Sequence, residues 1–146
     1  VGLGGSRRLD PGVLLHLFHS CGELYLQNRP AWKDFQPGRW DTAVGGHVDW
    51  GEEPLAALRR EVREEVGVTD FEPQHVLTYL FESERERELV YVYKTVYDGP
   101  VVPSGELDGG RFWTLREIAE GVGGGIFTPN FEGEIRRVAE LPDVGR

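Results

Sequence analysis

The chain of 146 residues contains no methionine and one cysteine, Cys21. One cysteine excludes an intrachain disulfide and a cysteine zinc site, which favours a reducing, cytoplasmic location. The absence of methionine leads us to expect residues before Val1. No apolar run approaches the roughly 18 residues that a membrane-spanning helix needs, so we expect no membrane partner.

Basic residues are also scarce. Lysine and arginine number 16 against 25 acidic residues, which gives a formal net charge of -9. Such a balance argues against a nucleic-acid polymer as the partner, because phosphate backbones bind basic surfaces. A small phosphorylated substrate stays compatible, because a bound metal can reverse the local field. The length fits one domain over residues 1–146.

The pattern of apolar residues predicts alternating strands and helices. We expect strands over residues 13–18, 24–27, 40–44, 76–81, 89–97 and 111–114, and helices over 54–66, 115–120 and 130–141. Pro54 suits the first turn of its helix and Gly67 suits a C-cap. His16 lies in an apolar strand, where we expect a buried side chain with a hydrogen-bond partner.

The helix that begins at Pro54 carries an unusual acidic cluster. Leu55, Leu58, Val62 and Val66 form its predicted buried stripe, with Glu61 and Glu65 to one side and Glu64 beyond them. Carboxylates this close repel one another unless a positive charge lies against them. Oxygen ligands of this kind suit Mg²⁺, or Mn²⁺ in its place.

The stretch from Gly46 to Val68, GHVDWGEEPLAALRREVREEVGV, contains a spaced motif. Its fixed positions are Gly46, Glu52, Arg60, Glu61, Val62, Glu64, Glu65, Gly67 and Val68. This pattern resembles the signature of the Nudix hydrolases at every fixed position. Many constrained positions at fixed spacing make the match specific, unlike a lone glycine motif.

The resemblance implies an α/β fold in which a mixed β-sheet is sandwiched between helices. It also implies metal-dependent hydrolysis of a diphosphate bond, as in a nucleoside diphosphate linked to another moiety. By position, Glu61, Glu64 and Glu65 correspond to the metal-binding glutamates of the family. Metal ions suit this chemistry because they neutralise phosphoryl charge and orient water.

Other signature positions imply supporting roles. Arg60 resembles the residue that orients the catalytic glutamates, and Glu52 would support the same network. Either Glu61 or Glu64 could act as the base for water. The carbonyl of Gly46 is a further candidate metal ligand, because glycine permits close backbone approach.

A narrower resemblance links the chain to the branch related to isopentenyl-diphosphate isomerase. It rests on Gln27, Arg29, Lys33, Trp40, Asp41, Gly46 and His47, and on the later segments FWTLREI and FTPNF. The isomerases need a cysteine just before the Gly-His pair, where this chain has Val44 and Gly45. That departure favours a hydrolase.

Several residues outside the helix are weaker candidates. Glu88 and Glu106 resemble acidic metal ligands found elsewhere in the superfamily, although each could be a solvated turn residue. Arg29 and Lys33 could contact phosphate or be surface charges. His47 could bind metal or substrate, or be structural.

Three functions follow from these residues. The leading one is a metal-dependent diphosphate hydrolase acting on a small molecule. The alternatives are a non-catalytic Nudix-like metabolite sensor and, less favoured, a prenyl-diphosphate isomerase. The group attached to the diphosphate is not encoded in the signature, and a homodimer is compatible with the sequence.

Overall fold

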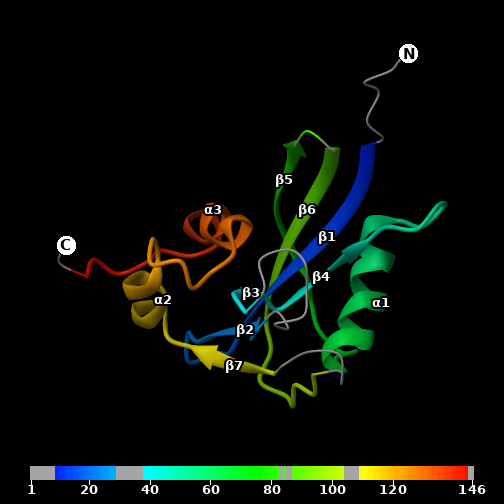
Figure 1. Ribbon diagram of the computed structural model, residues 1–146. Coiled ribbons are helices and arrows are strands. Elements are labelled where there is room, and N and C mark those ends of the chain that lie inside the picture. Colours follow the sequence, from blue (N-terminus) through cyan, green and yellow to red (C-terminus); the bar gives the residue numbers. More distant parts are fainter. Residues whose placement is uncertain (1–8, 29–37, 83, 85–86, 104–108, 145–146) are drawn as a thin grey trace.

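The computed structural model describes residues 9–28, 38–82, 84, 87–103 and 109–144. The strands are β1 (Leu9–Phe18), β2 (Leu24–Asn28), β3 (Trp40–Thr42), β4 (Val44–His47), β5 (Gln74–Glu82), β6 (Arg87–Val96) and β7 (Gly110–Trp113). The helices are α1 (Pro54–Val66), α2 (Leu115–Gly121) and α3 (Pro129–Val138). Figure 1 shows α1 on one side of the sheet and α2 and α3 on the other, so the predicted α/β sandwich is confirmed.

The sheet is mixed. Its central path runs β3-β2-β1-β6-β5, while β4 pairs with β1 and β7 pairs with β2. The β1–β6 pair is parallel, and the other pairs are antiparallel. Successive side chains of β1 therefore face opposite layers of the molecule. In the described part of the chain, no helix is long and apolar enough to span a bilayer.

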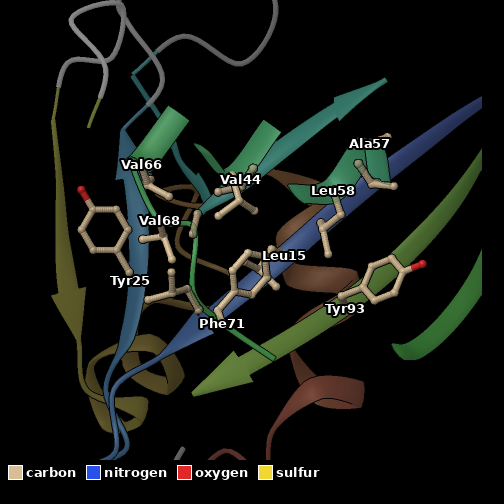
Figure 2. Packing of buried hydrophobic residues seen from close by; sticks show 13 residues of the cluster. Leu15, Tyr25, Val44, Ala57, Leu58, Val66, Val68, Phe71 and Tyr93 are labelled. Atoms are coloured by element: carbon tan, nitrogen blue, oxygen red, sulfur yellow. The ribbon is translucent and has the colours of Figure 1, made fainter. Parts of the chain in front are cut away.

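Helix α1 packs on one face of the sheet. Figure 2 shows Leu58 and Val66 of the helix against Leu15 and Val44 of the strands, and all four side chains are fully buried. Pro54 occupies the first turn, and Gly67 ends the helix in the left-handed conformation at φ 69°. Both predicted helix signals are confirmed.

The prediction is wrong for one residue of the buried stripe of α1. Leu55 is 42% exposed, whereas Ala57 is completely buried. Ala57 shares an i, i+4 row with Glu61 and Glu65, so the buried face of α1 is turned toward the acidic side. These two glutamates are consequently half-buried and face the sheet.

The opposite face packs against α2 and α3. His16 of β1 is fully buried there and its Nε2 lies 2.9 Å from Oε1 of Glu134 in α3, which confirms the core histidine. Helix α2 begins with a capping box between Thr114 and Glu117. Helix α3 is capped by Thr128 and ends at Val138, short of the predicted residue 141.

The predicted strand over residues 40–44 is interrupted. β3 pairs with β2, and β4 pairs with β1, so the chain changes partner at Ala43. The side-chain amide of Gln27 donates to the carbonyls of Thr42 and Ala43, both at 3.1 Å. These bonds give both backbone carbonyls at the break a side-chain donor. They also bring Gln27 beside the start of β4.

Candidate active site

The loop between β4 and α1 is closed by its own acidic residues. The Asp49 N–H donates to Oε1 of Glu52 at 2.9 Å, and the Glu52 N–H donates to the Asp49 carbonyl at 2.9 Å. The Glu52 carboxylate is therefore fixed just ahead of the helix. This position lets it meet a side chain two turns into α1.

That side chain is Arg60. Its Nε and Nη2 donate to the two oxygens of Glu52 at 3.0 and 2.9 Å, and Nη2 also donates to the His47 carbonyl at 3.0 Å. Its Nη1 donates to Oε1 of Glu61 at 2.7 Å and lies 3.6 Å from Oε1 of Glu64. One guanidinium thus joins the loop to two of the three predicted metal-binding glutamates.

Glu61 lies directly against the backbone of Gly46. A Cβ atom built on Gly46 would lie only 1.6 Å from Oε2 of Glu61. No side chain at that position is compatible with the observed carboxylate, so the need for glycine is steric. The close approach places a carboxylate beside the peptide group that the signature implies as a metal ligand.

Glu65 lies behind Glu61 on the same helical row. Burial, and then the negative charge of Glu61, raise the pKa of Glu65 to about 8. Hydrogen bonds from the Gly45 N–H and the Gln27 amide oppose that rise. Because two adjacent carboxylates compete for one proton, the proton belongs to the Glu61–Glu65 pair. A divalent cation is the alternative way to neutralise such a pair.

Glu88 approaches the same place from β6. A Cβ atom on Gly12 of β1 would lie 2.7 Å from Oε2 of Glu88 and 3.4 Å from the Gly46 carbonyl oxygen. The bare backbone of Gly12 therefore lets the Glu88 carboxylate lie near Gly46. Glu88 is half-buried within a strand, so its alternative interpretation as a solvated turn residue is wrong.

A cavity of about 250 Å³ adjoins Gly46 and Glu88, and the three helix glutamates are not part of its lining. We call it the Gly46 cavity; its lining includes Gly12, Gln27, Asp41, Gly46, His47 and Glu88. His47 is exposed at its rim, and Glu64 is 55% exposed on the helix. The other three predicted site residues, Arg29, Lys33 and Glu106, lie outside the described residues.

The described residues contain no ready-made cluster of three His, Cys, Asp or Glu side chains able to hold a metal ion. Arg60 instead binds Glu61 and lies near Glu64. The donor set still fits Mg²⁺ or Mn²⁺, because it consists of carboxylates beside a carbonyl oxygen. The proton-holding Glu61–Glu65 pair and the side-chain-free backbone at Gly46 are consistent with that fit.

Sequence reasoning assigned no site role to Gln27 or Asp49. Gln27 was visible only as part of a branch motif, yet it contacts the strand break and Glu65. Asp49 lies 3.5 Å from Arg60 Nη2, and no motif position marks it. Thr128, at the start of α3, is a further such residue. Its hydroxyl donates to Asp41 at 2.9 Å and so joins the FTPNF segment to β3.

Comparison with known proteins agrees with this architecture. The family model described as the NUDIX domain matches residues 8–131. An uncharacterised Nudix hydrolase of Pseudomonas aeruginosa, PA4841, is 34% identical over 69% of this chain and 60% of its own length. The isopentenyl-diphosphate Delta-isomerase of Serratia proteamaculans is 30% identical over 82% of this chain and 72% of its own length.

Solved structures show the same fold. DR0079 from Deinococcus radiodurans superimposes with a TM-score of 0.76 at 24% identity, covering 94% of this chain and 88% of that one. A MutT protein from Methanosarcina mazei gives 0.75 at 23% identity, covering 90% and 94%. At these identities the likeness establishes the fold, and the chemistry has to be argued from the site.

Proposed function

This chain belongs to the Nudix family, and from that premise we propose that it is a Mg²⁺-dependent hydrolase of diphosphate bonds in small molecules. One observation carries the proposal. Glu61 from α1 and Glu88 from β6 both reach the backbone around Gly46, and the latter does so over Gly12. This arrangement gathers oxygen donors from two elements around Gly46, which lines the Gly46 cavity together with Glu88.

We propose that Glu61, Glu64, Glu65, the Gly46 carbonyl and Glu88 would hold the metal. When bound, Mg²⁺ or Mn²⁺ neutralises charge on phosphoryl oxygens and lowers the pKa of water. Loading would need the proton of the Glu61–Glu65 pair to leave. Arg60 would keep Glu61 oriented through its bond of 2.7 Å.

Glu64 is our candidate for the base. Glu61 is fixed by Arg60 and packed on Gly46, whereas Glu64 is 55% exposed and only 3.6 Å from the same guanidinium. A carboxylate that can move is better suited to take a proton from the attacking water. The oxygen of that water then bonds to phosphorus. The bond from phosphorus to the bridging oxygen then breaks, and the leaving phosphate takes the electron pair.

An isomerase is the second candidate, because isopentenyl-diphosphate isomerases are among the 30% identical relatives. The resemblance to these isomerases implies that isomerisation needs a cysteine just before the Gly-His pair. Here Cys21 is exposed in the β1–β2 turn, while Gly46 pairs with Val13 in the middle of β1. The five residue-to-residue steps from Val13 to Phe18 alone span about 16 Å. Cys21 therefore cannot replace the missing group.

A turnover screen tests the proposal. Purified protein with Mg²⁺ would be given nucleoside diphosphate derivatives and prenyl diphosphates, with phosphate release and isomerisation both measured. We expect phosphate release, reduced by about 10²–10⁴-fold in Glu64→Gln. The control is Glu53→Gln, because Glu53 is exposed and its side chain makes no cap hydrogen bond.

Two outcomes would reject hydrolysis. Isomerisation without phosphate release would identify an isomerase despite the missing cysteine. Absence of any turnover, with wild type and Glu64→Gln binding a ligand equally well, would identify a metabolite sensor.

A further inference from the structure

A second cavity lies between β5 and α3, on the sheet face opposite α1. It has a volume of about 330 Å³, which is within the range of small-molecule sites. Leu77, Tyr79 and Phe81 of β5 line one wall, and Asn130, Glu134 and Arg137 of α3 line the other. We call it the Glu134 cavity. Its lining combines apolar side chains with a few polar ones.

The Glu134 cavity adjoins the Gly46 cavity. Phe81 pairs directly with Glu88, and Tyr79 pairs directly with Val90. Glu88 and Val90 line the Gly46 cavity, while Tyr79 and Phe81 line the other. Directly opposed residues of antiparallel strands have Cβ atoms about 5 Å apart on the same face. A molecule cleaved near Gly46 could therefore extend over β6 into the second cavity.

Glu134 is an unusual group to find in such a wall. Its side chain is only 3% exposed, and a buried carboxylate is costly unless hydrogen-bonded. His16 Nε2 lies 2.9 Å from one of its oxygens, and the Tyr79 hydroxyl donates to the other at 2.5 Å. An O–H···O contact of this length lies in the range of strong hydrogen bonds. Burial, and then the negative charge of Glu134, raise the pKa of Tyr79.

The fixed carboxylate has unused capacity. An ionised carboxylate offers about four lone-pair positions, and His16 and Tyr79 use two of them. The remaining positions can accept hydrogen bonds but cannot donate any. Asn130, which lines the same cavity, can do both. An isoprenoid chain would cover these groups and offer them no donor.

We propose that the Glu134 cavity receives the group attached to the diphosphate and selects groups that present N–H donors over isoprenoid chains. Glu134 is the residue that determines this specificity, and His16 and Tyr79 position it. The proposal rests on the proposed diphosphate hydrolysis, which fixes the other end of the substrate near Gly46. Although some relatives are named isopentenyl-diphosphate isomerases, the proposed substrate of this chain does not carry an isoprenoid group on its diphosphate.

The test compares three probes: amino-bearing nucleoside diphosphates, geranyl diphosphate, and methyl diphosphate, which lacks a large attached group. Turnover and calorimetric binding with Mg²⁺ are measured for wild type and for Glu134→Gln, which keeps the side-chain shape. We expect wild type to prefer an amino-bearing probe over geranyl diphosphate. Glu134→Gln should lose about tenfold of that preference, mainly in KM, with methyl diphosphate unaffected.

A matched control is Glu132→Gln on the same helix. Glu132 accepts from the Gly123 N–H at 3.0 Å and is not part of the cavity wall. Equal or better use of geranyl diphosphate by wild type would overturn the inference. So would an unchanged preference in Glu134→Gln, or no binding of any amino-bearing probe.

Binding separates this inference from the proposed function. If no probe is hydrolysed, the proposed hydrolase function is rejected. The inference about Glu134 then stands only if an amino-bearing probe still binds. In addition, Glu134→Gln has to weaken that binding about tenfold, and Glu132→Gln has to leave it unchanged. If hydrolysis occurs without any effect of Glu134, the proposed function stands and the inference fails.

Discussion

Arg60 and Glu52 are joined by two parallel hydrogen bonds, from Nε to Oε2 at 3.0 Å and from Nη2 to Oε1 at 2.9 Å. Such a fork fixes the plane of the guanidinium as well as its position. The remaining nitrogen, Nη1, is thereby directed at Glu61, which it contacts at 2.7 Å. The loop ahead of α1 consequently controls the orientation of a glutamate inside the helix.

Replacing Arg60 with lysine tests this arrangement. An ammonium group cannot form the fork, so Glu61 loses its orientation while the local charge is kept. We expect Arg60→Lys to lower activity or Mg²⁺ affinity by about 10–100-fold, as for other groups that orient metal ligands. Steady-state kinetics at several Mg²⁺ concentrations measure the loss. Arg63→Lys, an exposed position on the same helix, should leave both quantities unchanged.

Acid stability should also report on the pair. The hydrogen bond from Arg60 lowers the pKa of Glu52 from 4.5 to about 2. A carboxyl with a lower pKa in the folded state stabilises the fold above the unfolded value of 4.5, and that contribution is lost as the pH falls toward 2. The urea midpoints of wild type and Glu52→Gln should therefore differ more at pH 7 than at pH 3. A difference that grows on acidification would contradict the assignment.

The sequence predicted the elements of the fold better than their packing. Pro54 and Gly67 marked the ends of α1 because their backbone chemistry is local. Leu55 was misplaced because a helical wheel gives weight to large apolar side chains and little to Ala57. The break at Ala43 was missed because it follows from pairing with two different strands, β2 before the break and β1 after it, which no local pattern encodes.

The candidate site divides in the same way. Signature spacing placed Glu61 and Arg60 on one helix, but neighbouring residues of a helix do not face each other. Their contact depends on Glu52 of the loop, which orients the guanidinium. The approach of Glu88 to Gly12 depends on the parallel register of β1 and β6, which no local pattern encodes. The bond between His16 and Glu134 joins residues 118 positions apart, so only the folded chain reveals it.

The register of α1 can be checked by a matched pair of truncations. Leu58 is fully buried and Leu55 is 42% exposed. Leu58→Ala should lower the free energy of unfolding by about 2–5 kcal/mol because it leaves a cavity. Leu55→Ala should change it by about 0.5 kcal/mol or less. Urea unfolding measures both changes. Equal losses of unfolding free energy would show that Leu55 is buried like Leu58, as the sequence predicted.

Gly46→Ala tests the close contact between helix and strand. The added methyl would lie 1.6 Å from Oε2 of Glu61, so the carboxylate has to leave its position. We expect a loss of activity comparable to that of Glu61→Gln, about 10²–10⁴-fold. Circular dichroism would establish that the variant is folded. A folded Gly46→Ala protein with full activity would show that Glu61 works from another position.

Loading of the metal should release a proton. Burial and the charge of Glu61 raise the pKa of Glu65 to about 8, so the Glu61–Glu65 pair retains a proton at neutral pH when no metal is bound. A bound cation favours the ionised form, which means that Mg²⁺ affinity should rise with pH until about 8. Calorimetric titration with Mg²⁺ in buffers of different ionisation enthalpy would count about one proton released at pH 7. Glu65→Gln should abolish this release, because the amide cannot hold the proton. Binding of Mg²⁺ with no proton release by wild type would show that the metal does not engage this pair.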